Sequence, residues 1–213
     1  KCLIENLPCI SDVMASLQIL SELGASIRMI SKSTYEIDTT HLNCTEVSNE
    51  LSRQMRASYY FLGALLGRFG QATVAMPGGC NLGPRPIDQH LKVFSALGAE
   101  DSVDYGMITV RTKQELTGAH IFFDKVSVGA TMNGMLSAVM AKGQTILENC
   151  AKEPHVVDLA KGHVAAVKYV ETHKGCDVFN LGTGTGYSVL DMVKTFQEVN
   201  NVPVPYKIGD RRP

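Results

Sequence analysis

The chain has 213 residues, a net charge of -1, and only 19% charged residues. This length is enough for one large domain or two small ones with a sizeable core. The near-neutral balance argues against a general nucleic-acid or polyanion binder. Any anion that the chain binds must therefore be held by a local group of residues.

The cysteines and histidines predict neither a metal site nor a disulfide framework. Six cysteines are scattered without a Cys-x-x-Cys pair, and six histidines lack metal-ligand spacing. We predict reduced thiols, no metal, and surface or structural histidines. No apolar run approaches the roughly 18 residues that span a bilayer, and the first residues carry no signal-peptide pattern. These features predict a cytoplasmic protein with no membrane partner.

The first predicted elements are a helix and two strands. Asp12 occupies a position typical of a helix N-cap. Short β-rich segments at 26–30 and 34–37 predict strands. Apolar residues at three-residue intervals predict one buried helix face, formed by Met14, Leu17, Leu20 and Leu23.

The same pattern returns with a period of about 73 residues. Residues 70–74 recur as 143–147, and Leu-Gly-Ala occurs at both 23–25 and 97–99, while the Ile-Glu-Asn of residues 4–6 is echoed two periods later. Asp88 is the second predicted N-cap, followed by an apolar face at Leu91, Phe94 and Leu97 and a strand at 107–110. Such a repeat indicates one supersecondary unit used more than once, in an α/β fold with helices packed against sheets.

A loop rich in glycine and proline holds one cysteine near an arginine. Residues 77–86 contain three glycines and three prolines, which exclude the interior of a helix or a central strand. The loop places Cys80 at a surface or cleft, and Arg85 could hold an anionic reactant beside the thiol. A free cysteine in an ordinary loop is the alternative.

A second candidate anion site lies at 125–131. Ser127 is predicted to cap a helix that runs through Met132, Leu136 and Val139. The start of this helix offers free N–H groups, and Lys125 adds a full positive charge. These groups suit a phosphate, although a plain N-cap beside a solvated lysine explains the same residues.

The periodicity fails in the last quarter of the chain. Asp158 should open another helix of the repeat, but no Leu-Gly-Ala follows it at 168–170. A strand at 178–181, a turn at 182–186 and a helix at 188–199 are predicted instead. The turn reads Gly-x-Gly-x-Gly and lacks the spacing and following chain of a dinucleotide fingerprint.

Several of these motifs together resemble the UDP-N-acetylglucosamine enolpyruvyl transferase family, the 1-carboxyvinyltransferases of peptidoglycan synthesis. The resemblance implies domains built from repeated βαβαββ units, the inside-out α/β barrel type. It also implies transfer of an enolpyruvyl group from phosphoenolpyruvate to UDP-N-acetylglucosamine. It runs from about residue 1 to about residue 160 and is dense at 55–58, 77–88, 118–121, 125–131 and 148–158.

The same resemblance implies roles for individual residues. Cys80 would be the general acid on C3 of phosphoenolpyruvate and the thiol that the epoxide antibiotic fosfomycin alkylates. Arg85 would help to bind the phosphoenolpyruvate anion, and Arg56, otherwise readable as a solvated surface charge, would contact the UDP-sugar. The full set implied to contact the UDP-sugar is Arg56, Arg85, Pro86, Ile87, Asp88, Gln89, Lys125, Ser127 and Val128.

Two parts of the family's cleft have no counterpart in the sequence. A lysine–asparagine pair would lie upstream of Lys1, and a second domain would supply a catalytic aspartate and another phosphate-binding arginine. We therefore expect impaired turnover by this chain alone. We also expect uncovered faces that favour self-association.

From about His155 the chain resembles the C-terminal, UDP-sugar-binding part of a UDP-glucose 4-epimerase. The matching segments are 155–164, 180–184 and 211–213. We therefore predict a chimera, with a partial enolpyruvyl-transferase domain at 1–160 and a short α/β epimerase-like tail at 161–213.

Three functions follow from these resemblances. The leading one is an enolpyruvyl transferase that uses no cofactor. An epimerase-type enzyme that uses NAD is the rival, but its NAD-binding glycines and its Tyr-x-x-x-Lys pair are absent from the sequence. A non-catalytic fragment that binds a UDP-sugar is the third.

Overall fold

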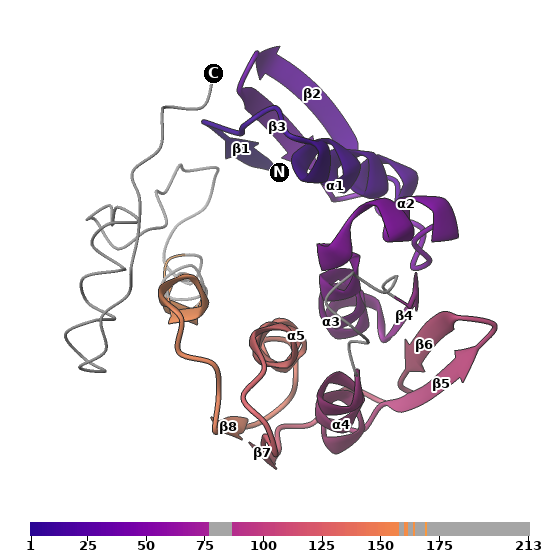
Figure 1. Cartoon of the computed structure of the whole chain (residues 1–213), viewed down its shortest axis with the longest axis vertical. Coiled ribbons are helices and arrows are strands. Elements are labelled where there is room, and N and C mark those ends of the chain that lie inside the picture. The colour runs from indigo at the N-terminus through magenta and orange to yellow at the C-terminus, as the bar shows by residue number, and fades with distance from the viewer. Residues whose placement is uncertain (77–86, 158–159, 162–163, 165–168, 170–213) are drawn as a thin grey trace, which may run out of the picture. The chain divides into compact units, whose positions relative to one another are not determined.

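The computed structural model describes residues 1–76, 87–157, 160, 161, 164 and 169. Helices and strands are interspersed along this part of the chain (Figure 1), which confirms the predicted α/β class. The strands are β1 Cys2–Ile4, β2 Ser26–Ser31, β3 Thr34–Asp38, β4 Gln71–Ala75, β5 Glu100–Asp104, β6 Met107–Arg111, β7 His120–Phe122 and β8 Ile146–Glu148. The helices are α1 Ser11–Glu22, α2 Asn49–Gln54, α3 Tyr60–Phe69, α4 Asp88–Ala96 and α5 Val128–Ala138, with a 3-10 helix η1 at Arg56–Tyr59.

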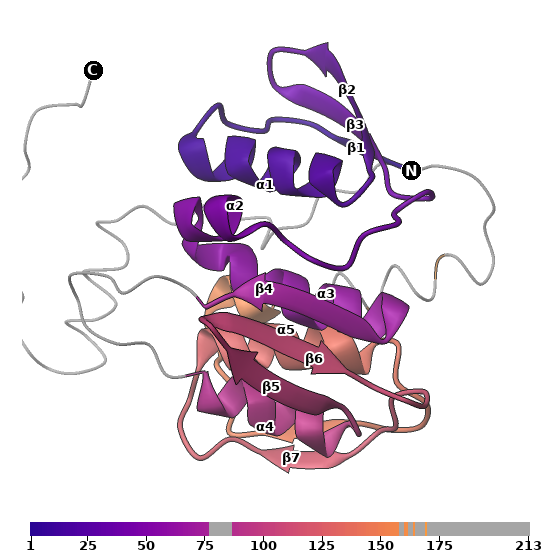
Figure 2. The same cartoon turned by 90° about the vertical axis from the view of Figure 1, so that its right-hand side faces the viewer.

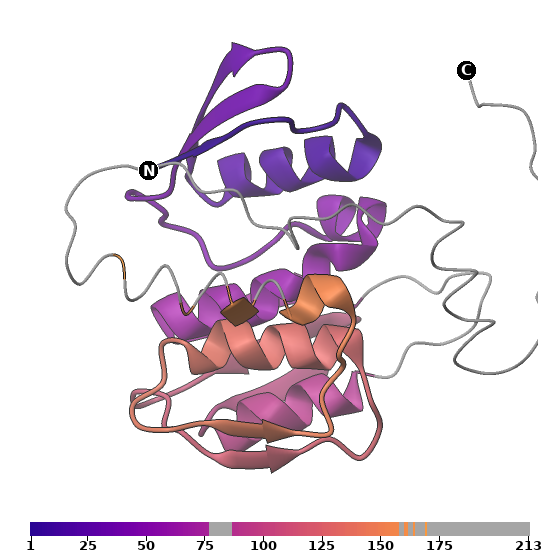
Figure 3. The ribbon, with the colours of Figure 1, turned by 90° about the vertical axis from the view of Figure 1, so that its left-hand side faces the viewer.

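Two three-stranded antiparallel sheets repeat one topology. Their strand orders are β1-β3-β2 and β4-β6-β5, so the last strand of each copy lies in the middle of its sheet. Figure 2 shows the second sheet with its three strands side by side, and Figure 3 shows from the opposite side how α1 lies along the first sheet. The predicted repeat is therefore confirmed as a repeat of structure.

Left-handed backbone conformations recur with the same period. Gly24 has a φ of 101° after α1, and Gly98 has a φ of 96° after α4. A positive φ at the end of a helix suits glycine because it has no Cβ. Asn6 and Asn149, two periods apart, have φ values of 57° and 56°. The repeated sequence motifs thus mark positions with the same backbone conformation.

The middle of the chain contains a complete βαβαββ unit. Glu46 pairs in parallel with Thr73, so a short extended segment, α3 and β4 form a parallel βαβ motif, which α4, β5 and β6 extend. In the next unit, β7 and β8 are parallel and flank α5. This arrangement confirms the predicted type of unit.

Both predicted aspartate N-caps are wrong. Asp12 and Asp88 lie in the first turns of α1 and α4, whose N-cap residues are Ile10 and Ile87. Neither cap position makes a side-chain hydrogen bond to the helix. A carboxylate inside the first turn still interacts favourably with the helix dipole, which explains why the sequence pattern resembles a cap.

The buried face of α1 is also shifted from the predicted one. Met14, Leu17 and Leu20 are only half-buried, because the helix presents residues four apart to the core. The fully buried positions are Ala15, Ile19 and Leu23. In α5 the predicted Met132 and Leu136 are likewise half-buried, and small or polar side chains face the interior.

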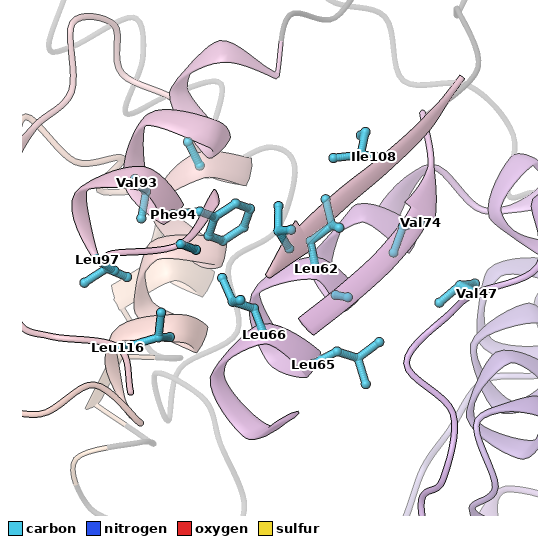
Figure 4. Packing of buried hydrophobic residues seen from close by; sticks show 14 of the residues in the cluster. Val47, Leu62, Leu65, Leu66, Val74, Val93, Phe94, Leu97, Ile108 and Leu116 are labelled. Atoms are coloured by element: carbon cyan, nitrogen blue, oxygen red, sulfur yellow. The ribbon is translucent and has the colours of Figure 1, made fainter. Parts of the chain in front are cut away.

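Small residues allow α3 and α5 to approach closely. A Cβ atom on Gly63 would lie 2.6 Å from Asn133 Oδ1, and one on Gly67 would lie 3.0 Å from the carbonyl oxygen of Leu136. Larger residues at these positions would push the helices apart. Around this contact α3, α4 and the second sheet enclose the main hydrophobic core (Figure 4), which includes Leu62, Leu65, Leu66, Val74, Val93, Phe94, Leu97 and Ile108.

Several predictions fall outside the described residues. They include the structure of the loop 77–86, the helix expected at Asp158 and the elements expected at 178–199. The boundary at residue 160 and the epimerase-like tail therefore stay predictions. Within the described part, no helix is long and apolar enough to cross a membrane.

Candidate functional site

One pocket lies where α4 and α5 begin. Its volume is about 450 Å³, which is within the usual range for small-molecule sites. It is lined by Tyr59, Tyr60, Ile87, Asp88, Gln89, His90, Lys125, Val126, Ser127, Val128 and Gly129. Six of the residues predicted to contact a UDP-sugar therefore share one pocket: Ile87, Asp88, Gln89, Lys125, Ser127 and Val128.

The other predicted site residues are not all placed. Cys80, Arg85 and Pro86 lie outside the described residues. The backbone of Arg56 begins the 3-10 helix η1, which ends at the pocket residue Tyr59. The structure thus describes the wall predicted to bind the nucleotide sugar, but not the loop predicted to carry the acid.

The first turn of α5 presents hydrogen-bond donors to the pocket. Ser127 is the N-cap, and its Oγ accepts a hydrogen bond of 3.2 Å from the N–H of Ala130. This confirms the predicted cap. Among the described residues, the N–H groups of Val128 and Gly129 have no acceptor. With Lys125 on the same wall, these groups provide both dipole and charge for an anion.

A buried glutamine connects α4 to the segment before α5. Gln89 is only 8% exposed, and its Oε1 accepts a hydrogen bond of 3.0 Å from the N–H of Asp124. The Asp124 carboxylate accepts hydrogen bonds from Lys92 at 2.8 Å and from the Gln89 amide at 3.2 Å. These two bonds hold the pKa of Asp124 below its usual value. Gln89 therefore fixes the backbone immediately before Lys125.

A buried asparagine connects α5 to both α3 and α4. Asn133 is 0% exposed, and its Oδ1 accepts a hydrogen bond of 2.9 Å from the N–H of Gly63. Its Nδ2 lies 3.1 Å from the carbonyl oxygen of Tyr59 and 2.8 Å from His90 Nδ1. The His90 ring packs edge-on against Tyr59, with ring centroids 5.0 Å apart. The aromatic wall of the pocket is thereby fixed from behind.

The electrostatic environment keeps His90 neutral. Burial lowers the pKa of His90 from 6.5 to about 4, although the nearby Asp88 carboxylate acts in the opposite direction. The imidazole is therefore uncharged at neutral pH. Lys125 and Asp88 are the charged side chains that line the pocket, one of each sign.

Sequence reasoning missed three pocket residues, Tyr59, Tyr60 and His90, whereas Val126 and Gly129 lie within the candidate anion site predicted at 125–131. His90 was predicted only as a surface or structural histidine, and the structure shows it to be both structural and pocket-lining. The close contacts of Gly129 explain its residue type, because a Cβ there would lie 2.9 Å from both His90 Cε1 and Tyr59 Oη. No group of three or more potential metal ligands occurs in the part of the chain that the structure describes.

The sequence is similar to curated carboxyvinyltransferases. It is 55% identical over 157 residues to UDP-N-acetylglucosamine 1-carboxyvinyltransferase 3 of Caldanaerobacter subterraneus subsp. tengcongensis, a match that covers 74% of this chain and 37% of that protein. It is 42% identical over 205 residues to UDP-N-acetylglucosamine 1-carboxyvinyltransferase 2 of Bacillus subtilis, covering 96% of this chain and 45% of that protein. The chain thus spans less than half the length of these relatives.

Solved structures share the fold. The enolpyruvyl transferase NikO from Streptomyces tendae matches with a TM-score of 0.63 at 21% identity, over 76% of this chain and 38% of that one. EPSP synthase from Acinetobacter baumannii matches with a TM-score of 0.56 at 19% identity, over 75% and 37% of the two chains. The family model of EPSP synthase (3-phosphoshikimate 1-carboxyvinyltransferase) matches residues 1–166. The repeated units and the sequence match together show that the chain belongs to the EPSP synthase family.

Proposed function

We propose that this chain is part of an enzyme that transfers the enolpyruvyl group of phosphoenolpyruvate to UDP-N-acetylglucosamine, the step that serves peptidoglycan synthesis. The observation that carries the proposal is the 55% identity to a UDP-N-acetylglucosamine 1-carboxyvinyltransferase over 157 residues. That level of identity far exceeds what the shared fold alone requires, since the fold neighbours are only about 20% identical. The substrates are accordingly taken from this relative and not from the fold.

The pocket supports a role in binding the UDP-sugar. The N–H groups of Val128 and Gly129, together with Lys125, suit a diphosphate because they combine directed donors with positive charge. Ile87 and Gln89 lie on the other wall, where they can contact the nucleoside. This division of the pocket assigns the diphosphate to α5 and the nucleoside to the start of α4.

The chemistry is assigned to the loop that follows β4. Cys80 serves as the general acid that protonates C3 of phosphoenolpyruvate, and Arg85 and Arg56 bind anionic groups of the two substrates. The loop enters α4 through Ile87, which lines the pocket. In sequence, the loop joins β4 to the pocket-lining start of α4, which supports its assignment to this site.

Phosphate release tests the proposed reaction. The chain is incubated with UDP-N-acetylglucosamine and phosphoenolpyruvate, and inorganic phosphate is followed beside a full-length relative. We expect UDP-sugar binding with turnover well below that of the relative. Release that Cys80→Ala abolishes would assign the acid to Cys80. Binding without any release would leave a UDP-sugar-binding fragment, and absence of binding would contradict the proposal.

Fosfomycin labelling tests the loop separately. We expect one adduct in the intact-mass spectrum, located on Cys80 by peptide mapping, because an epoxide reacts with an activated thiol. Cys80→Ala should remain unlabelled. An adduct on Cys2 or Cys9, both exposed, would instead indicate simple accessibility.

The epimerase-like tail at 161–213 remains part of the proposal. The family match ends at residue 166, close to the predicted junction, and this supports a change from one family's sequence to another's there. The relative from Bacillus subtilis nevertheless aligns over 205 residues, which favours a continuous chain. Sequencing reads across residues 155–163 of the source DNA would distinguish a recombined gene from an assembly error.

Self-association is proposed from exposed apolar residues on the first sheet. Met29 and Ile30 of β2 are 64% and 48% exposed, and Ile4 of β1 is 39% exposed. Uncovered apolar side chains at a sheet edge promote pairing between copies. Light scattering across a concentration series should show a rising average mass, and a constant monomer mass would refute this proposal.

A further inference from the structure

The hydrogen bonds around Asn133 fix the proton of the His90 imidazole. Asn133 Oδ1 accepts from the N–H of Gly63, so the amide cannot be turned around without placing its NH₂ group against another donor. Nδ2 then donates one hydrogen to the carbonyl oxygen of Tyr59 and the other to His90 Nδ1. His90 Nδ1 must therefore be an acceptor. The proton of the neutral ring lies on Nε2.

The Nε2–H group of His90 opens into the pocket. His90 is only 7% exposed, and no partner for Nε2 exists among the described residues. Buried side-chain atoms without a partner in that part of the chain are Ser48 Oγ, Ser52 Oγ and Thr145 Oγ1, and His90 Nε2 is not among them. Nε2 is therefore reached by solvent, and His90 lines the pocket that the described residues form at the start of α4 and α5.

The same nitrogen lies at the first turn of α5. His90 Cε1 would be 2.9 Å from a Cβ atom on Gly129, and Nε2 is bonded directly to Cε1. Gly129 is the second residue of α5, whose own N–H has no acceptor among the described residues. A buried imidazole donor and the free N–H groups of the helix therefore face one volume.

We propose that His90 is a further ligand-binding residue, whose Nε2–H donates a hydrogen bond to a phosphate oxygen of a nucleoside diphosphate bound at the start of α5. Asn133 is a positioning residue that sets the tautomer and the ring orientation. This inference rests on the proposed function for the identity of the ligand. A neutral donor fits here because Lys125 already supplies a positive charge on this wall.

A matched pair of substitutions separates binding from packing. In His90→Asn the side-chain oxygen takes the place of Nδ1 and can accept from Asn133, but nothing replaces Nε2–H. In His90→Gln the amide nitrogen takes the place of Nε2, and the acceptor for Asn133 is lost. His120→Asn is the control, since His120 lies on β7, pairs with Glu148 and does not line the pocket.

Calorimetric titration of the full chain with UDP-N-acetylglucosamine, UDP and uridine provides the readout. We expect His90→Asn to weaken binding of both diphosphates about 10- to 100-fold, which is typical for a hydrogen bond to a charged group. Uridine binding and the control His120→Asn should be unchanged. His90→Gln should bind the diphosphates more tightly than His90→Asn does.

The outcomes distinguish this inference from the proposed function. Equal diphosphate binding by the wild-type chain and His90→Asn would overturn the role of His90 and leave the proposed function intact. If the wild-type chain binds none of the three probes, both fail. Should the variants not fold, ring ¹⁵N spectra of the wild-type chain decide: we expect the Nε2–H tautomer and a shift of this signal with UDP but not with uridine. No shift would overturn the inference.

Discussion

The two βαββ copies, at residues 2–38 and 71–111, share a topology, but only the second lines the pocket. Their helices α1 and α4 bury corresponding positions, 74 residues apart. In α1 these are Ala15, Ile19 and Leu23, and in α4 they are Gln89, Val93 and Leu97. Apart from Phe94, which is buried where Leu20 of α1 is half-buried, the apolar positions match, and the polar difference lies at the N-terminal end of the helix.

That difference is a pair of polar residues. Gln89 and His90 occupy the positions where the first copy has Ala15 and Ser16. Ser16 is half-buried, and its Oγ bonds to the carbonyl oxygen of Asp12 in its own helix and to Met55 Sδ before η1. His90 is bonded to another helix through Asn133 instead. The repeat determines the backbone, and buried polar residues that depart from it mark the site.

Among the substitutions that test this comparison, Asn133→Ala should lower the stability of the chain the most. It removes the partners of Gly63 and His90 at once and leaves buried polar groups unsatisfied, so we expect the free energy of unfolding to fall by about 3 to 5 kcal/mol. Urea denaturation followed by circular dichroism measures the loss. Ser16→Ala, at the repeat position of His90, should cost less than about 1 kcal/mol. Similar losses for both variants would show that the hydrogen bonds of Asn133 stabilise the chain no more than those of Ser16 do.

The pH dependence of stability should also single out the second copy. The pKa of His90 is about 4 in the folded chain and 6.5 in the unfolded one, so the unfolded state binds the proton first as the pH falls. Stability is therefore complete above pH 6.5 and decreases towards pH 4, by about 3 kcal/mol at about 1.4 kcal/mol per pKa unit. Urea denaturation curves recorded between pH 6.5 and pH 4 measure this decrease in stability.

His90→Asn isolates this contribution from the carboxylates. Glu36, Glu100 and Asp124 also have lowered pKa values, because of ion pairs and hydrogen bonds, and they too make the chain less stable in acid. The variant keeps these groups and lacks the imidazole. Its stability should therefore fall less steeply than that of the wild-type chain between pH 6.5 and 4. Parallel curves would mean that His90 is not held neutral by burial.

The sequence predicted the features that depend on neighbouring residues. The period of about 73 residues, the strands at 26–30 and 107–110 and the Ser127 cap all follow from local patterns, and the structure confirms them. Local patterns are less exact at the ends of elements, as the misplaced caps at Asp12 and Asp88 show. The sequence pattern is nearly the same whether the carboxylate is at the N-cap or in the first turn of the helix.

The Asn133 network could not be predicted in this way. Asn133 and His90 are 43 positions apart, and Asn133 and Gly63 are 70 apart, so no periodicity connects them. In a helix pattern an asparagine between methionine and glycine suggests only a solvent-facing residue. The three helices must pack before this side chain acquires its partners. An alignment of the two copies by 74 residues places His90 where the first copy has Ser16.

Gln89→Ala should have an intermediate effect. It brings the second copy closer to the first, where Ala15 occupies this position, and it leaves the N–H of Asp124 without its acceptor. We expect a loss of about 1 to 2 kcal/mol in the free energy of unfolding, measured by urea denaturation. Gln18→Ala, at an exposed position of α1, is the matched control and should change stability by less than about 0.5 kcal/mol. Equal effects would remove Gln89 from the description of the site.

The smallest expected effect is a contrast between two serine N-caps. Replacing one should lower the free energy of unfolding, and replacing the other should leave it unchanged or raise it. Ser127 caps α5 through its Oγ, so Ser127→Ala should cost about 1 kcal/mol of unfolding free energy. Ser48 precedes α2 without any side-chain cap bond, and its Oγ is buried with no partner among the residues that the structure describes. Ser48→Ala removes an unsatisfied hydroxyl and should leave stability unchanged or slightly raised. Thermal and urea unfolding of both variants test this contrast, which disappears if both serines prove equally costly to replace.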